Sequence, residues 1–117
     1  MPNLISLETL RAELSTDAPP RVLEILPPAS FAAGHLPGAE NLPLQGLDQA
    51  VRALVPDQRA PIVTYCSGPT CNNSHLAARR LTELGYENVR VFAGGKVVWR
   101  DAGLPLESVT PAARTGS

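Results

Sequence analysis

The chain has 117 residues, of which 44% are hydrophobic and 18% charged, and its formal net charge is -1. A chain of this length forms one domain, and its composition predicts a folded core rather than disorder. Ten basic residues against eleven acidic ones leave no surplus of either sign, which argues against nucleic acid and anionic membranes as partners.

The first third of the chain predicts two short helices around a buried strand. Ser6 precedes leucines spaced three and four residues apart, which indicates an amphipathic helix over residues 6–14 with Ser6 as its N-cap. Residues 21–26 are an apolar run bounded by proline pairs, typical of a buried strand. One or two helical turns are expected at 29–33, and a turn-rich connector at 34–39.

Strands and helices alternate through the rest of the chain as well. The expected elements are a brief strand at 40–42, a helix around 47–54, a strand ending at Cys66, a helix from Ser74 to a stop at Gly85, a strand at 88–92 and a helical stretch at 97–101. This alternation through short links predicts an α/β fold in which helices cover both faces of a mostly parallel sheet.

The segment from Pro61 to Ser74 carries the strongest chemical signal. A β-branched strand ends at Cys66, a small polar loop follows, and a helix opens at Ser74. Helix amino termini favour anions, so we expect a lowered pKa for Cys66 and interpret it as a nucleophile. The backbone of the loop is expected to cradle the anion, and its residues are Ser67, Gly68, Pro69, Thr70, Cys71, Asn72 and Asn73.

The second cysteine leaves two interpretations open. Cys71 is either a resolving thiol, which attacks a persulfide or sulfenic acid at Cys66, or a residue that packs the loop. A metal site that adds His35 or His75 is disfavoured, because the paired C-x2-C spacing is absent. Two cysteines so close in sequence do not staple a secreted domain, and neither a secretory signal nor a membrane-spanning stretch is evident, so a cytoplasmic protein is expected.

Three segments resemble, in the same order, the rhodanese-like (thiosulfate sulfurtransferase-like) single-domain family. They are residues 34–44, the strand, loop and helix around Cys66, and residues 85–105 with the pair Gly94-Gly95. The resemblance implies a rhodanese-like three-layer sandwich over residues 1–107. The small and polar residues of 108–117 predict a flexible carboxyl-terminal tail.

The same resemblance implies the chemistry. Cys66 would take sulfane sulfur from a small donor, carry it as a persulfide and pass it to a thiophilic acceptor, either a small molecule or a protein thiol. No cofactor or metal is implied, and a monomer or weak homodimer is expected.

The sequence departs from the family pattern at three places. The loop is two residues longer than the common form and holds no lysine or arginine, which argues against thiosulfate as the natural donor. Glu24-Ile25-Leu26 stands where the family has an aspartate, an apolar residue and an arginine, and Lys96 replaces an apolar residue. No role is assigned to Glu24 or Lys96 from the sequence.

Three other functions remain as alternatives. The first is a thiol redox protein or sensor that uses Cys66 and Cys71 as a pair. The second is a phosphatase or arsenate reductase, which normally needs an arginine six positions after the cysteine, where this chain has Asn72. The third is a non-catalytic binding module, against which the presence of Cys66 argues.

Overall fold

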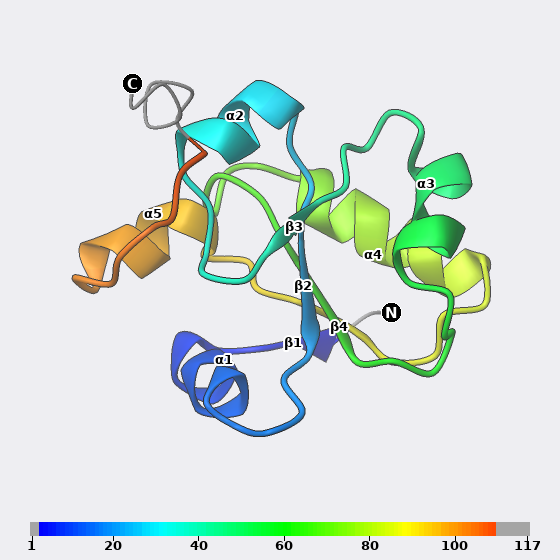
Figure 1. The fold of residues 1–117 in the computed structure, drawn as a ribbon, viewed down its shortest axis with the longest axis horizontal. Helices are drawn as coiled ribbons and strands as arrows, with labels where there is room; N and C mark the ends of the chain where they lie inside the picture. Colours follow the sequence, from blue (N-terminus) through cyan, green and yellow to red (C-terminus); the bar gives the residue numbers. More distant parts are fainter. Residues whose placement is uncertain (1–2, 110–117) are drawn as a thin grey trace.

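A five-stranded parallel sheet forms the centre of the molecule (Figure 1). The computed structural model describes residues 3–109. The sheet order is β1-β5-β4-β2-β3. The strands are β1 (Asn3–Leu4), β2 (Arg21–Glu24), β3 (Glu40–Asn41), β4 (Ile62–Tyr65) and β5 (Val89–Val91). The long strands β2 and β4 are therefore central, and their carboxyl ends lie side by side, with Glu24 paired to Tyr65.

Helices cover both faces of this sheet and make the fold a three-layer α/β sandwich (Figure 1). They are α1 (Leu7–Leu14), α2 (Pro28–Ala33), α3 (Leu47–Leu54), α4 (Asn73–Glu83) and α5 (Gly95–Asp101). Leu23 and Ile62 pack with α3 and α4 in one core, whereas Val22 and Val63 pack with α1 and α5 in the other. Successive strand residues thus serve opposite cores, as the two-residue period of a strand requires.

Two predicted helix ends are confirmed by their capping. The Ser6 hydroxyl accepts a 3.1 Å hydrogen bond from the backbone N–H of Thr9 and so caps α1. Helix α4 stops before Gly85, which adopts a φ of 102°, and the N–H of Tyr86 reaches back 3.0 Å to the carbonyl of Leu81. This closing pattern satisfies carbonyl groups that the helix end leaves free.

Strand β2 ends at Glu24 rather than at residue 26, and two further elements differ from the sequence-based expectation. Strand β1 was not predicted, because two exposed residues at a sheet edge carry no periodic pattern and pair only once β5 is in place. Helix α5 begins at Gly95 rather than at residue 97. Its first N–H groups, those of Lys96 and Val97, bond to loop carbonyls far away in sequence, and no local pattern reports that.

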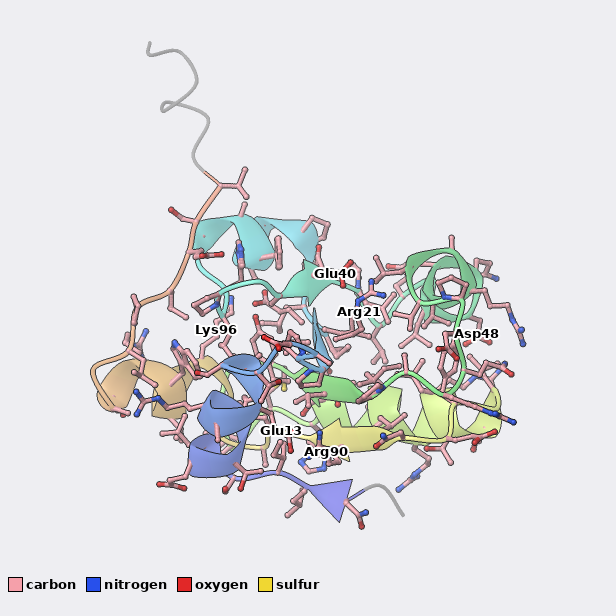
Figure 2. All side chains as sticks on the ribbon, turned by 60° about the horizontal axis from the view of Figure 1, so that its bottom comes forward. Glu13, Arg21, Glu40, Asp48, Arg90 and Lys96 are labelled. Atoms are coloured by element: carbon pink, nitrogen blue, oxygen red, sulfur yellow. The ribbon has the colours of Figure 1, made fainter. Side chains whose placement is uncertain are left out.

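Bidentate ion pairs fasten neighbouring elements (Figure 2). Arg90 of β5 donates to both carboxylate oxygens of Glu13 on α1, at 2.8 and 2.6 Å. Arg21 of β2 pairs in the same way with Glu40 of β3, at 2.8 Å to each oxygen. The planar guanidinium matches a carboxylate at two points, so each pair fixes an angle as well as a distance.

The described chain ends beside α2. The backbone N–H of Val109 donates to the carbonyl of Ala32 at 2.9 Å. The predicted tail begins at residue 108, and its residues 110–117 lie outside the described residues. Among residues 3–109, no helix is long and apolar enough to cross a membrane.

Candidate active site

Cys66 lies where the sequence places it, between the carboxyl end of β4 and the amino end of α4. Its Sγ lies 3.4 Å from the carbonyl oxygen of Cys71 and 3.5 Å from Oγ of Ser74, a residue in the first turn of α4. The side chain of Cys66 is 1% exposed. The predicted order of strand, thiol, loop and helix is therefore the one observed.

The first turn of α4 is held against the strand ends by two side chains. The buried Thr64 hydroxyl on β4 donates to the carbonyl of Ser74 at 3.0 Å. The Asn73 amide donates to the carbonyl of Ile25, just past β2, at 3.2 Å. These bonds fix Ser74 relative to Cys66, so the distance between helix and sulfur is set by the sheet itself.

The opposite helix, α5, holds the first half of the loop. The N–H of Lys96 donates to the carbonyl of Cys66 at 3.1 Å, and the N–H of Val97 donates to that of Ser67 at 3.0 Å. Gly95 has a φ of 60°, and a Cβ built there would lie 2.4 Å from the carbonyl oxygen of Cys66. Only glycine allows this approach, because any side chain would push the loop backbone away.

The expectation of a lowered pKa for Cys66 is wrong for this structure. Burial raises the pKa of the Cys66 thiol, and the hydrogen bond with the Cys71 side chain raises it further. The hydroxyl and backbone N–H of Ser74 act in the opposite direction but do not outweigh burial. The helix end contributes as predicted, whereas desolvation, which is invisible in a sequence, decides the sign.

The pKa of Cys71 is shifted in the opposite direction, below its usual value. It is partly exposed, and burial alone would raise its pKa, but hydrogen bonds from the Cys66 thiol, from the backbone of Asn73 and from the backbone and hydroxyl of Ser67 lower it. The anion-stabilising groups that were expected around Cys66 therefore gather mainly at Cys71. A buried thiol and a partly exposed thiol with a lowered pKa lie in contact within one loop.

A buried charged network lies beneath the first half of the loop, and the sequence reading missed it. The Glu24 carboxylate at the end of β2 is fully buried. One oxygen accepts a 2.6 Å hydrogen bond from Tyr65, and the other lies 3.1 Å from Nζ of Lys96. Lys96 also donates to the carbonyl of Ser30 at 2.8 Å, and Tyr65 accepts from the N–H of Leu36 at 3.0 Å.

This network acts on the residues that carry the thiol. Tyr65 precedes Cys66 directly, and the backbone of Lys96 binds the Cys66 carbonyl. Burial, with the Glu24 carboxylate second, raises the pKa of the Tyr65 hydroxyl strongly, so this hydroxyl stays a hydrogen-bond donor. The sequence signal for this pair was that both residues depart from the family pattern. The arginine that the family carries after its first strand is absent here, and a lysine stands at position 96 instead of an apolar residue.

The second half of the loop faces outward. The side chains of Pro69, Thr70 and Asn72 are exposed. No group of three or more histidine, cysteine, aspartate or glutamate side chains converges among residues 3–109 in a way that suits a metal ion. Beside Asn73, a cavity of about 360 Å³ is lined mainly by apolar side chains such as those of Pro27 and Leu44, with Gln45 and Asn73 as its polar members.

The chain matches one known protein over nearly its whole length and another over less than half of its length. A model of the rhodanese-like domain matches residues 6–102. A sulfurtransferase of Allochromatium vinosum is 29% identical over 106 residues, which cover 91% of this chain and 95% of that protein. An HTH-type transcriptional regulator of Mycobacterium tuberculosis is 34% identical over 90 residues, 77% of this chain and 38% of the regulator.

The structural comparison agrees. The crystal structure of a thiosulfate sulfurtransferase from Pseudomonas aeruginosa superposes with a TM-score of 0.81 at 33% identity, covering 91% of this chain and 20% of that one. The architecture and the position of the cysteine thus define a three-layer α/β domain of the rhodanese type. The chain belongs to the rhodanese-like domain family, as its motifs indicated. Its relatives include proteins named as sulfurtransferases.

Proposed function

We propose that this protein is a sulfurtransferase in which Cys66 carries sulfane sulfur as a persulfide. The observation that supports this most directly is the position of Cys66, at the end of β4 and in contact with the first turn of α4, in a member of the rhodanese-like family. A thiolate attacks polarised sulfur, and the N–H and hydroxyl of Ser74 stabilise the thiolate form of Cys66.

The reaction proceeds in two balanced exchanges. The Cys66 thiolate attacks the outer sulfur of a donor R–S–SH, which forms Cys66–S–SH and releases RS⁻. An acceptor thiolate then takes the outer sulfur and leaves the Cys66 thiolate. Because Cys66 is 1% exposed, the outward half of the loop, residues 69–72, must move before a donor reaches Sγ.

The donor is proposed to be an organic persulfide rather than thiosulfate. The loop contains no lysine or arginine, and the nearby amine of Lys96 is engaged by Glu24 and by the Ser30 carbonyl. A dianion would therefore find no free cation in the described loop, whereas the cavity beside Asn73 suits the uncharged part of an organic donor.

The proposal extends to the acceptor, the location and the oligomeric state. A thiophilic acceptor, either a small molecule or a protein thiol, completes the reaction. We propose a cytoplasmic location, because two cysteines close in sequence do not staple a secreted domain, and a monomer or weak homodimer. No role in binding nucleic acid or membranes is proposed.

The test is to weigh the intact protein after exposure to a sulfur donor. Cys66→Ser and Cys71→Ser variants are incubated separately with an organic persulfide, thiosulfate and mercaptopyruvate. We expect Cys71→Ser to gain about 32 Da, the mass of one sulfur, and Cys66→Ser to gain none, since only Cys66 holds the intermediate. A gain on Cys66→Ser, or on neither variant with any donor, would refute the proposal.

A thiol redox protein is the second candidate, because the two thiols are in contact. Peroxide would then oxidise one cysteine to a sulfenic acid, and the other would close a disulfide with loss of water. Mass spectrometry after a limited dose of peroxide checks this. A sulfonic acid on one cysteine instead of a Cys66–Cys71 disulfide would exclude the redox role.

A further inference from the structure

The two loop thiols differ in exposure although they lie close together. Cys66 is buried at 1% exposure, whereas Cys71 is partly exposed, and each thiol shifts the pKa of the other. The carbonyl of Cys71 lies 3.4 Å from the Cys66 sulfur. A turn in which the N–H of Cys71 donates to the carbonyl of Gly68 at 3.1 Å folds the loop back toward Cys66.

We propose that Cys71 discharges the sulfur carried on Cys66 as hydrosulfide and closes a Cys66–Cys71 disulfide. This inference rests on the proposed function, because it needs the Cys66 persulfide as its starting point. It assigns to the protein a second activity, the reduction of sulfane sulfur to sulfide, beside transfer to an external acceptor.

This step is a thiol exchange and needs no further oxidant. The Cys71 thiolate attacks the inner sulfur of Cys66–S–SH, the bond between the two persulfide sulfurs breaks, and HS⁻ leaves with its proton. The two cysteine sulfurs become the disulfide, and the outer sulfur takes up the electron pair. A dithiol reductant, such as a thioredoxin-type protein, then reduces the disulfide by exchange and restores both thiols.

The residues around Cys71 favour its thiolate, which is the form that attacks a persulfide. The backbone N–H groups of Ser67 and Asn73, with the Ser67 hydroxyl, lower the pKa of Cys71 and so keep its thiolate populated at a lower pH than that of Cys66. The described loop offers no lysine or arginine that would hold a persulfide anion on Cys66. Hydrogen bonds from Ser67 and Asn73 therefore stabilise the attacking sulfur of Cys71, whereas Ser74 alone does so for Cys66.

The experiment compares a single turnover in three proteins. Reduced wild type, Cys71→Ser and Cys71→Ala are freed of reductant and mixed, without oxygen and at low protein concentration, with one equivalent of cysteine persulfide. Released sulfide is measured over time, and intact mass is read under non-reducing conditions. The Cys66→Ser/Cys71→Ser double variant corrects for sulfide that the donor releases by itself.

We expect wild type to release about one sulfide per chain and to lose about 2 Da as the disulfide forms, and dithiothreitol to reverse the loss. Both Cys71 variants should keep the added 32 Da, the mass of one sulfur, and release sulfide at least about tenfold more slowly. Retention of the added sulfur also shows that the variant loop is intact, so loss of folding is not mistaken for loss of the resolving thiol.

Two results would contradict the inference and can be told apart. If wild type keeps the added sulfur as stably as Cys71→Ser, Cys71 does not resolve the persulfide, while the proposed sulfurtransferase function stands. If neither Cys71 variant gains sulfur, the Cys66 persulfide itself fails, and the proposed function fails with it. A disulfide found only in a dimer would assign the exchange to two chains rather than to one loop.

Discussion

The two halves of the loop after β4 are built in different ways. The first half, Cys66 to Gly68, is fastened by α5 through two backbone hydrogen bonds, and the Glu24–Lys96 pair lies beneath it. The second half, residues 69–72, has exposed side chains and carries the partly exposed Cys71. The comparison teaches that the backbone of Cys66 is anchored by α5, whereas residues 69–72 turn exposed side chains to solvent.

The largest loss of stability is expected from Gly95→Ala, which affects the first half of the loop, the part that α5 holds. A Cβ at this position would lie 2.4 Å from the Cys66 carbonyl, and the φ of 60° adds backbone strain. We expect a loss of about 4 kcal/mol or more in the free energy of unfolding, measured by urea denaturation, together with loss of sulfur loading.

Gly103→Ala is the matched control at the other end of α5. Its φ is 82°, but a Cβ there meets nothing within 4 Å. Strain alone should cost about 1 to 2 kcal/mol and leave sulfur loading intact. Equal losses in the two variants would mean that Gly95 matters only for its backbone angle and not for contact with the loop.

The next effect is expected from Lys96→Met, which leaves the buried Glu24 carboxylate without its ion-pair partner. Breaking a buried pair from one side costs about 3 kcal/mol, again read from urea denaturation. The double variant Glu24→Gln/Lys96→Met removes both charges and should recover much of that stability. If the single and double variants are equally unstable, the pair does not support the loop through its charges.

A third prediction compares the two thiols directly by their pH profiles. Because the pKa of Cys71 is lowered and that of Cys66 is raised, Cys71 should be alkylated by iodoacetamide at a lower pH, and Cys66 should react only as the solution becomes alkaline. Peptide mapping of wild type at a series of pH values gives both profiles. The reverse order would show that the lowered pKa belongs to Cys66, as the sequence alone suggested.

The smallest effect is expected in the outward half. Thr70→Ala replaces an exposed side chain and should change the free energy of unfolding by no more than about 0.5 kcal/mol. The shift of the urea midpoint measures this. A loss comparable to that of Lys96→Met would show that the second half of the loop is as firmly held as the first.

The sequence by itself determined the order of the elements from α1 onward, the family, and the place of Cys66 between a strand and a helix. Helix caps such as Ser6, stops such as Gly85 and the strand that ends at Cys66 are local patterns, so they are readable from neighbouring residues. The family motifs added the three-layer arrangement, because their order fixes which segments meet.

Only the tertiary structure decided which thiol is the more acidic and what supports the loop. The pKa of Cys66 depends first on how deeply the fold buries its thiol, and no window of sequence reports how much water a folded site excludes. Glu24 and Lys96 lie far apart in the chain, and their partnership exists only because the end of β2 and the start of α5 meet beneath Cys66. Local sequence patterns determine where helices and strands begin and end. The pKa values and ion pairs of the site depend on residues that only the folded chain brings together.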